Sequence, residues 1–112
     1  MEQQKPIRKS KDYAKGKNYI VRNYINDKIY IGSTCQTLSQ RMSQHRKNMN
    51  SKQSQHMKLY EALQENGKEK FYIELLEDYN CERKEQLLKR EGEIIREHKA
   101  ELNKRIEKQT KK

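Results

Sequence analysis

The segment KNYIVRNYINDKIYIGS, from Lys17 to Ser33, restricts the possible folds of this chain more than any other feature. Tyrosines and β-branched aliphatic residues stand on both sides of Asn26-Asp27, a pair that tolerates left-handed backbone angles. This pattern predicts two strands, over residues 17–24 and 28–32, joined by a turn. Apolar residues make up only 31% of the chain and charged residues 38%, so the fold has a single modest core.

The hairpin contains three of the seven tyrosines of the chain. If its loop has an even number of residues, Tyr19 and Tyr30 project to one face beside Gly32, which leaves open space there. The opposite face carries the isoleucines Ile20, Ile29 and Ile31, and we predict that they supply the buried side. Two explanations for the tyrosines stay open: they pack a small core, or they face a reaction.

The rest of the chain predicts three helices and a third strand. Thr37 and Gln40 have the spacing of a capping box at the start of TLSQRMSQHRKNM. A second helix over residues 54–67 ends at Asn66-Gly67, a strand follows over 70–77, and a long helix covers 81–103. The order β-β-α-α-β-α predicts an α+β domain, with a small three-stranded antiparallel sheet flanked by about three helices.

The two ends of the chain are basic. We predict a flexible basic arm over residues 1–16, a folded domain over 17–103 and a basic tail over 104–112. The net charge of +10 and the pI near 9.6 indicate a polyanionic partner, most simply nucleic acid.

No apolar run is long enough to cross a membrane and no signal peptide is visible. The isolated Cys35 and Cys81 fit a reduced, intracellular protein of the cytoplasm or nucleus.

Glu91 is out of place on the last helix, because the spacing of its neighbours Leu87 and Ile94 puts it on the inward face. Burying an unpaired carboxylate costs several kcal/mol. The carboxylate is therefore either at the boundary of the core, paired with one of the many lysines, or a metal ligand.

Arg41 and His45 lie one helical turn apart and share a face. His45 borders an apolar stripe, so it is either a packing residue or a functional one. The planar fork of donors on Arg41 suits phosphate oxygens. Its positive charge also disfavours protonation of His45, which keeps the imidazole neutral and able to accept a proton.

Taken in order, these residues resemble the GIY-YIG nuclease family. The two strand motifs read KNY (residues 17–19) and YIG (residues 30–32). The resemblance continues through LSQRMSQH with Arg41 and His45, LLKREGEII with Glu91, and ELN with Asn103, and so covers about residues 17 to 103. The first motif departs from the family at two positions, where Lys17 and Asn18 replace glycine and isoleucine.

The resemblance implies hydrolysis of a phosphodiester of double-stranded DNA, by nicking or by a dimer that forms transiently on DNA. One divalent metal is implied, Mg²⁺ or Mn²⁺ in its place, and the products carry a 5′-phosphate and a 3′-hydroxyl. Glu91 corresponds to the sole metal ligand, Arg41 to the phosphate-binding residue, and Tyr19 to the base, assisted by His45. Tyr30 positions the water or the phosphate. Further substrate contacts are assigned to Lys28, Gly32 and Asn103.

Two other classes of protein remain as alternatives. The first is a catalytically inactive, basic nucleic-acid-binding module with the same fold, for which the unusual KNY is the best support. The second is a disordered histone-like protein, but the predicted hairpin and the apolar stripes of the predicted helices argue against disorder.

Overall fold

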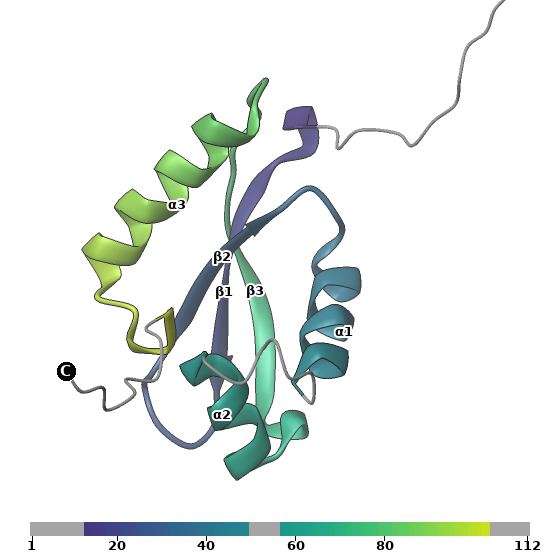
Figure 1. Ribbon diagram of the computed structural model, residues 1–112, viewed down its shortest axis with the longest axis vertical. Coiled ribbons are helices and arrows are strands. Elements are labelled where there is room, and N and C mark those ends of the chain that lie inside the picture. Colours follow the sequence, from purple (N-terminus) through teal and green to yellow (C-terminus); the bar gives the residue numbers. More distant parts are fainter. Residues whose placement is uncertain (1–12, 50–56, 104–112) are drawn as a thin grey trace, which may run out of the picture.

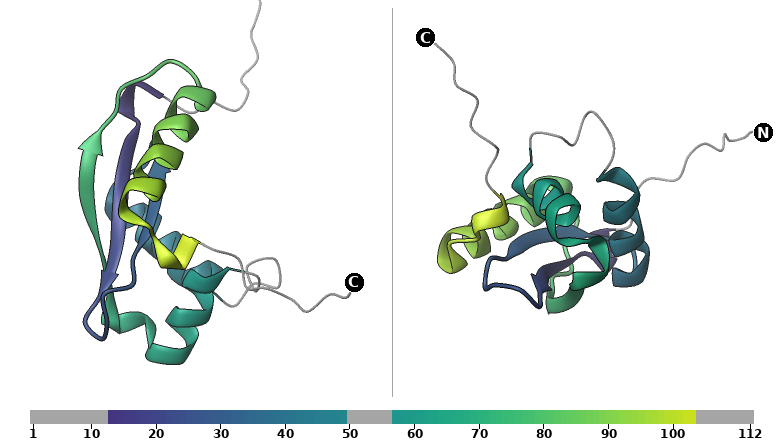
Figure 2. Two further views of the ribbon diagram at one scale, coloured as in Figure 1. Left: turned by 90° about the vertical axis from the view of Figure 1, so that its left-hand side faces the viewer. Right: turned by 90° about the horizontal axis from the view of Figure 1, so that it is seen from below.

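The computed structural model describes residues 13–49 and 57–103 (Figure 1). Its main elements are β1 (Lys17–Asn23), β2 (Tyr30–Thr34), α1 (Leu38–Asn48), α2 (Lys58–Asn66), β3 (Phe71–Asp78) and α3 (Lys84–His98). The described residues also include three short 3₁₀ turns: η1 (Tyr13–Lys15) before β1, η3 (Lys68–Lys70) between α2 and β3, and η4 (Glu101–Asn103) after α3 (Figure 2). The sheet is antiparallel with strand order β2-β1-β3. The predicted α+β fold is confirmed.

The hairpin has the predicted faces. Tyr19 lies opposite Gly32, Val21 opposite Tyr30, and Ile20 opposite Ile31. The strand β2, however, begins at Tyr30 and not at the predicted position 28. Asn23 Oδ1 accepts hydrogen bonds from two loop amides, those of residues 25 and 26, at 2.8 Å each. The Asn23 side chain thus stabilises a loop that extends into the first residues of the predicted second strand.

Both faces of the sheet are covered, which corrects the prediction that the isoleucines alone supply the buried side. In Figure 1, α3 and α1 lie on opposite sides of the sheet. The larger core cluster lies on the tyrosine face, where Tyr19 is 0% and Tyr30 8% exposed, and it includes residues of α1 and α2. The smaller cluster joins Ile20 and Ile31 to Ile94 of α3. A three-stranded sheet with helices on both sides buries both of its faces.

The third strand departs from simple alternation because of a β-bulge. Asn18 pairs with Glu77, but Tyr19 pairs with Leu75, which leaves Leu76 without a partner across the ladder. As a result, Leu76 packs against the smaller core cluster and Leu75 is 47% exposed.

The last helix is shorter than predicted and ends at His98, because Lys99 adopts a left-handed backbone conformation with φ of 51°. The chain then turns back, so that Leu102 of η4 packs into the larger cluster on the other side of the sheet. Leu88, which follows the buried Leu87 in this helix, is 47% exposed.

Residues 13–16 were assigned to the flexible arm but are part of the folded domain. The backbone oxygen of Tyr13 accepts from Cys81 N at 3.0 Å, and that of Gly16 accepts from Tyr79 N at 2.9 Å. The remaining residues of the predicted arm and the tail over 104–112 lie outside the described residues. None of the described helices is long and apolar enough to span a membrane.

Candidate active site

Tyr19 stands at the centre of the site, on the middle strand of the sheet. Its Oη lies 2.8 Å from His45 Nε2 and accepts a hydrogen bond from Arg41 Nε at 3.1 Å. The start of α1, which carries both partners, is held by the predicted capping box. Gln40 N donates to Thr37 Oγ1 and Thr37 N to Gln40 Oε1, both at 3.1 Å. Sequence-distant groups thus converge on one phenol.

Gly32 allows the Tyr19 ring to lie across β2. A Cβ added to Gly32 would stand 2.4 Å from Tyr19 Oη and 2.5 Å from its Cζ. The open space predicted beside Gly32 is therefore filled by the tyrosine itself. Gly32 serves the site by making room for Tyr19.

A Gly32→Ala variant is expected to lose about 1–3 kcal/mol of unfolding free energy, because the methyl group overlaps a fully buried ring. Gly92→Ala is a matched control. Its added Cβ meets only Arg96 Nη1, at 3.6 Å, and alanine stabilises a helix interior relative to glycine by up to about 1 kcal/mol. Urea unfolding measures both. Equal stability of Gly32→Ala and wild type would contradict the close contact.

Tyr30 closes the other side of the imidazole. Its ring meets that of His45 edge-on, with centroids 5.4 Å apart and planes at 81°, and lies 6.3 Å from the Tyr19 ring. Burial raises the pKa of the Tyr30 phenol far above its usual value. Tyr30 is therefore a neutral, packed neighbour of the site.

Asn103, predicted to bind phosphate or the end of the last helix, forms two hydrogen bonds with β2. Its Oδ1 accepts from Ile31 N at 2.8 Å and its Nδ2 donates to Ile31 O at 2.7 Å. Because Ile31 lies between Tyr30 and Gly32, this amide positions the strand that carries both residues.

Glu91 reaches β2 from α3. Its Oε1 accepts a hydrogen bond from Ser33 Oγ at 3.0 Å. Burial raises the pKa of the Glu91 carboxyl, although the Ser33 hydroxyl and the charge of Arg41 act to lower it. Within the described residues no lysine or arginine forms a salt bridge with Glu91, while its neighbour Arg90 pairs with Glu77 and Glu93. The half-buried carboxylate thus has a hydroxyl but no paired cation.

The groups near Glu91 suit a magnesium ion better than a metal whose ligands all come from protein side chains. No group of three or more His, Cys, Asp or Glu side chains that could hold a metal occurs in residues 13–49 and 57–103. Mg²⁺ commonly takes one or two carboxylates and keeps several waters. A single, partly desolvated carboxylate beside a hydroxyl is compatible with this coordination.

The electrostatics of the two central groups differ. Burial, with a smaller contribution from Arg41, lowers the pKa of His45 to about 3, so the predicted neutral imidazole agrees with the structure. Burial also raises the pKa of Tyr19 to about 12 and outweighs the stabilising effect of Arg41 on the phenolate. In the protein alone, Arg41 therefore lowers the pKa of Tyr19, but burial raises it by more, so the phenol is harder to ionise than a free tyrosine.

Lys28 is not brought to this cluster. It is exposed in the loop between β1 and β2. There it lines a shallow hollow together with His98, Lys99 and Glu101.

Two residues of the site were missed by sequence reasoning. Tyr60 of α2 is 5% exposed, and its Oη lies 2.7 Å from His45 Nδ1. Ser33, which holds Glu91, follows directly after the YIG motif. Tyr60 follows the buried Leu59 in α2, and no pattern in the sequence distinguishes it as a residue of the site.

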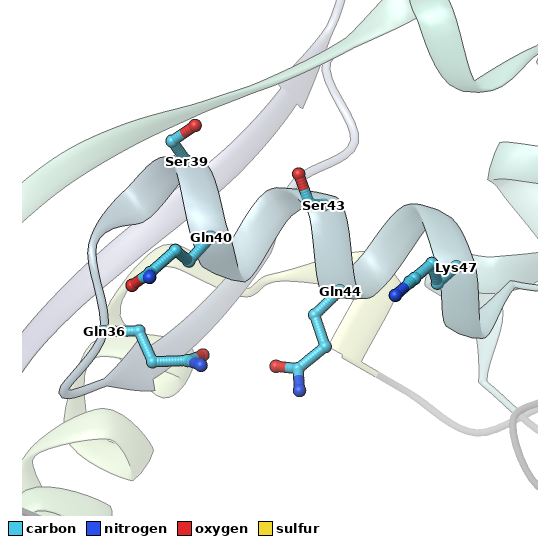
Figure 3. Close-up of a pocket in the computed structure, with 6 residues that line it drawn as sticks. All are labelled: Gln36, Ser39, Gln40, Ser43, Gln44 and Lys47. Atoms are coloured by element: carbon cyan, nitrogen blue, oxygen red, sulfur yellow. The ribbon is translucent and has the colours of Figure 1, made fainter.

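The outward face of α1 is a polar surface next to Arg41. Figure 3 shows the side chains that line a hollow of about 330 Å³ there: Gln36, Ser39, Gln40, Ser43, Gln44 and Lys47. No acidic residue occurs in α1. Gln44 connects this surface to the site, because its Oε1 accepts from Arg41 Nη1 at 2.7 Å.

Comparisons with known proteins agree with this arrangement. The chain is similar to the catalytic domain of the homing endonuclease I-TevI, with 26% identity and a TM-score of 0.62 over 80% of this chain and 95% of that one. A mutant of the catalytic domain of the intron endonuclease I-TevI shares the fold, with 23% identity and a TM-score of 0.66 over 86% and 96% of the two chains. No curated protein matches the sequence. The GIY-YIG catalytic domain matches residues 15–106, and the chain therefore belongs to the GIY-YIG family.

Proposed function

We propose that this protein is a metal-dependent DNA endonuclease that activates water with Tyr19. The observation that carries the proposal is that a guanidinium and a neutral imidazole both lie within 3.1 Å of the phenol oxygen Tyr19 Oη. Glu91 lies close enough to act electrostatically on Tyr19. Family membership and the homing and intron endonuclease activities named for the similar structures support the same reaction class.

Each side chain has a role that its chemistry allows. Glu91 would hold Mg²⁺, or Mn²⁺ in its place, with the Ser33 hydroxyl orienting one carboxylate oxygen. The bound ion would supply positive charge to the phosphate and to the departing 3′-oxygen. Arg41 keeps N–H donors for a non-bridging oxygen, which holds the phosphate in line for attack. Tyr19 passes its own hydroxyl hydrogen to His45 Nε2 as it accepts the proton of the water, and the products carry a 5′-phosphate and a 3′-hydroxyl.

The Tyr19 phenol is difficult to ionise in this environment, which limits its use as a base. A pKa of about 12 makes ionisation at pH 7 unfavourable by roughly 7 kcal/mol, since each pKa unit corresponds to about 1.4 kcal/mol. Tyr19 therefore rests as a neutral phenol in the free protein. Its use as a base requires positive charge to gather at the site together with the substrate.

DNA as substrate is supported by charge and by surface chemistry. The chain carries a net charge of +10. Beside Arg41, the outward face of α1 offers amides, hydroxyls and the Lys47 ammonium without a carboxylate among them. Such groups hydrogen-bond phosphates, sugars and base edges. We infer a double-stranded substrate, cut either by nicking or by a dimer that forms transiently on DNA.

The alternative of an inactive binding module depended on the altered first motif, and the structure weakens it. Lys17 Nζ donates to the backbone oxygen of Gln36 at 2.9 Å, and Asn18 Nδ2 donates to Glu77 at 3.1 Å. Both residues lie in a strand whose pairing with β2 is regular, although the buried Asn18 Oδ1 has no hydrogen-bond partner among the described residues. Tyr19, the one residue of the motif that the chemistry needs, keeps its place opposite Gly32.

A plasmid assay tests the proposed function. We expect wild-type protein with Mg²⁺ to convert supercoiled plasmid to nicked or linear DNA with ends that a ligase can rejoin. Removal of the metal with EDTA is expected to stop cleavage, and gel-shift assays should still detect bound DNA. Protein that binds DNA but leaves the plasmid intact with both Mg²⁺ and Mn²⁺ would establish the binding module instead.

A further inference from the structure

The environment of His45 suggests a role for a residue that the motifs do not include. The ring is fully buried, and a hydroxyl lies at each nitrogen, Tyr19 Oη at 2.8 Å from Nε2 and Tyr60 Oη at 2.7 Å from Nδ1. The titratable and charged groups facing the ring come from four elements: Arg41 of α1, Tyr19 of β1, Tyr30 of β2 and Tyr60 of α2. At neutral pH only the guanidinium among them is charged, so the imidazole is neutral with a single N–H.

The hydrogen bonds around Tyr19 indicate which nitrogen carries that hydrogen. Arg41 can only donate, so Tyr19 Oη accepts from it and keeps its own hydrogen to give elsewhere. The positive charge of Arg41, next to Tyr19, favours a lone pair over an N–H on the near side of the imidazole. Nε2 then accepts from the Tyr19 hydroxyl, and the N–H lies on Nδ1, where only a hydrogen-bond acceptor can satisfy it.

We propose that Tyr60 is a positioning residue, which accepts the Nδ1–H of His45 and thereby holds the tautomer that takes the Tyr19 hydroxyl hydrogen. With one lone pair of Tyr19 Oη engaged by Arg41 and its hydrogen directed to His45, the second lone pair is left for the attacking water. Tyr60 thus has the place of a third group that orients a base through its neighbour. Its effect on cleavage rests on the proposed function, whereas its effect on His45 does not.

Nitrogen NMR of the full chain, labelled with ¹⁵N and without metal or DNA, tests the tautomer directly. His56→Gln and His98→Gln variants assign the signals of the other two histidines of the chain. We expect wild-type His45 to be protonated on Nδ1. In Tyr60→Phe, a buried N–H without an acceptor is disfavoured, and the tautomer ratio should move towards Nε2–H about five-fold or more. A wild-type ring protonated mainly on Nε2, or an unchanged ratio in the variant, would overturn the proposal.

Cleavage kinetics test the consequence. Tyr60→Phe keeps the ring that packs in the core, and we expect kcat to fall about ten-fold with the KM for plasmid unchanged. Tyr72→Phe is the matched control, because its ring stacks on Tyr24 with centroids 4.8 Å apart, away from His45, and it should keep the wild-type rate. A Tyr60→Phe enzyme with wild-type kcat would refute the positioning role.

The two measurements separate two kinds of failure. If wild-type protein cuts no DNA, the proposed function falls, but the tautomer of His45 still supports or overturns the assignment of Tyr60. If Tyr60→Phe loses its far-UV circular dichroism and does not fold, the proposal is judged on the wild-type protein alone. It is then supported by a His45 ring protonated on Nδ1 and overturned by one protonated on Nε2.

Discussion

Glu91→Ala is expected to leave supercoiled plasmid intact, with a cleavage rate at least roughly 10³-fold below that of wild type. The proposed metal has a single carboxylate in this chain to hold it, and no group of acidic, histidine or cysteine side chains among the described residues replaces that ligand. Binding of DNA in the absence of metal should be unchanged, because Glu91 contributes no positive charge. Single-turnover cleavage of plasmid with Mg²⁺ and a gel-shift titration together measure the two quantities.

Removal of the Glu91 charge alone, by Glu91→Gln, should not destabilise the fold. Burial raises the pKa of Glu91, so the ionised carboxylate is less favourable in the folded than in the unfolded protein. This penalty is present at neutral pH and disappears as the pH falls and the group is protonated. Glu91→Gln is therefore expected to be at least as stable as wild type at pH 7 in urea unfolding.

Glu97→Gln is the control for both measurements, since it removes an exposed carboxylate of the same helix. It should retain wild-type cleavage. A Glu91→Ala protein that cuts at the wild-type rate, or a Glu97→Gln protein that is equally inactive, would remove Glu91 from the metal site.

Arg41→Ala is expected to slow cleavage by at least about 10²-fold while DNA affinity stays mostly intact. The substitution removes both the donor to the phosphate and the donor to Tyr19 Oη. Arg41→Lys should recover little of the loss, because an ammonium lacks the planar fork of donors. Single-turnover rates at saturating protein separate the chemical step from binding.

Lys47→Ala provides the matched loss of one positive charge from the same helix. Lys47 lies on the outward face and has no place in the proposed reaction, so its removal should weaken binding slightly and leave the single-turnover rate unchanged. Lost affinity with unchanged turnover in Arg41→Ala would show that Arg41 binds DNA in general and does not act on the phosphate.

Local patterns predicted the parts of the fold that local interactions decide. The capping box at Thr37 and the shared face of Tyr19, Tyr30 and Gly32 both follow from sequence spacing, and both are confirmed. Arg41 and His45 meet Tyr19 because a capped helix presents them one turn apart. The prediction that His45 is neutral agrees with the structure, although burial contributes more to this than Arg41 does.

The remaining features depend on packing between distant segments, which spacing does not reveal. The tyrosine face is buried because α2 covers it, and α2 also supplies Tyr60 to the imidazole. The end of α3 is decided by the left-handed conformation of Lys99, a residue type with no preference for that conformation. For the same reason, spacing does not predict the two hydrogen bonds between the Asn103 amide and Ile31.

The contact of Asn103 with Ile31 has a consequence for self-association. Strand β2 forms one edge of the sheet, and an uncovered edge offers backbone groups to which another chain can add. Here a side-chain amide satisfies both backbone groups of Ile31, and Leu102 N donates to the oxygen of Ile29 at 2.9 Å. Two copies cannot join their sheets through this edge without first detaching η4. Double-strand cutting by two copies would accordingly not rely on pairing between their β2 strands.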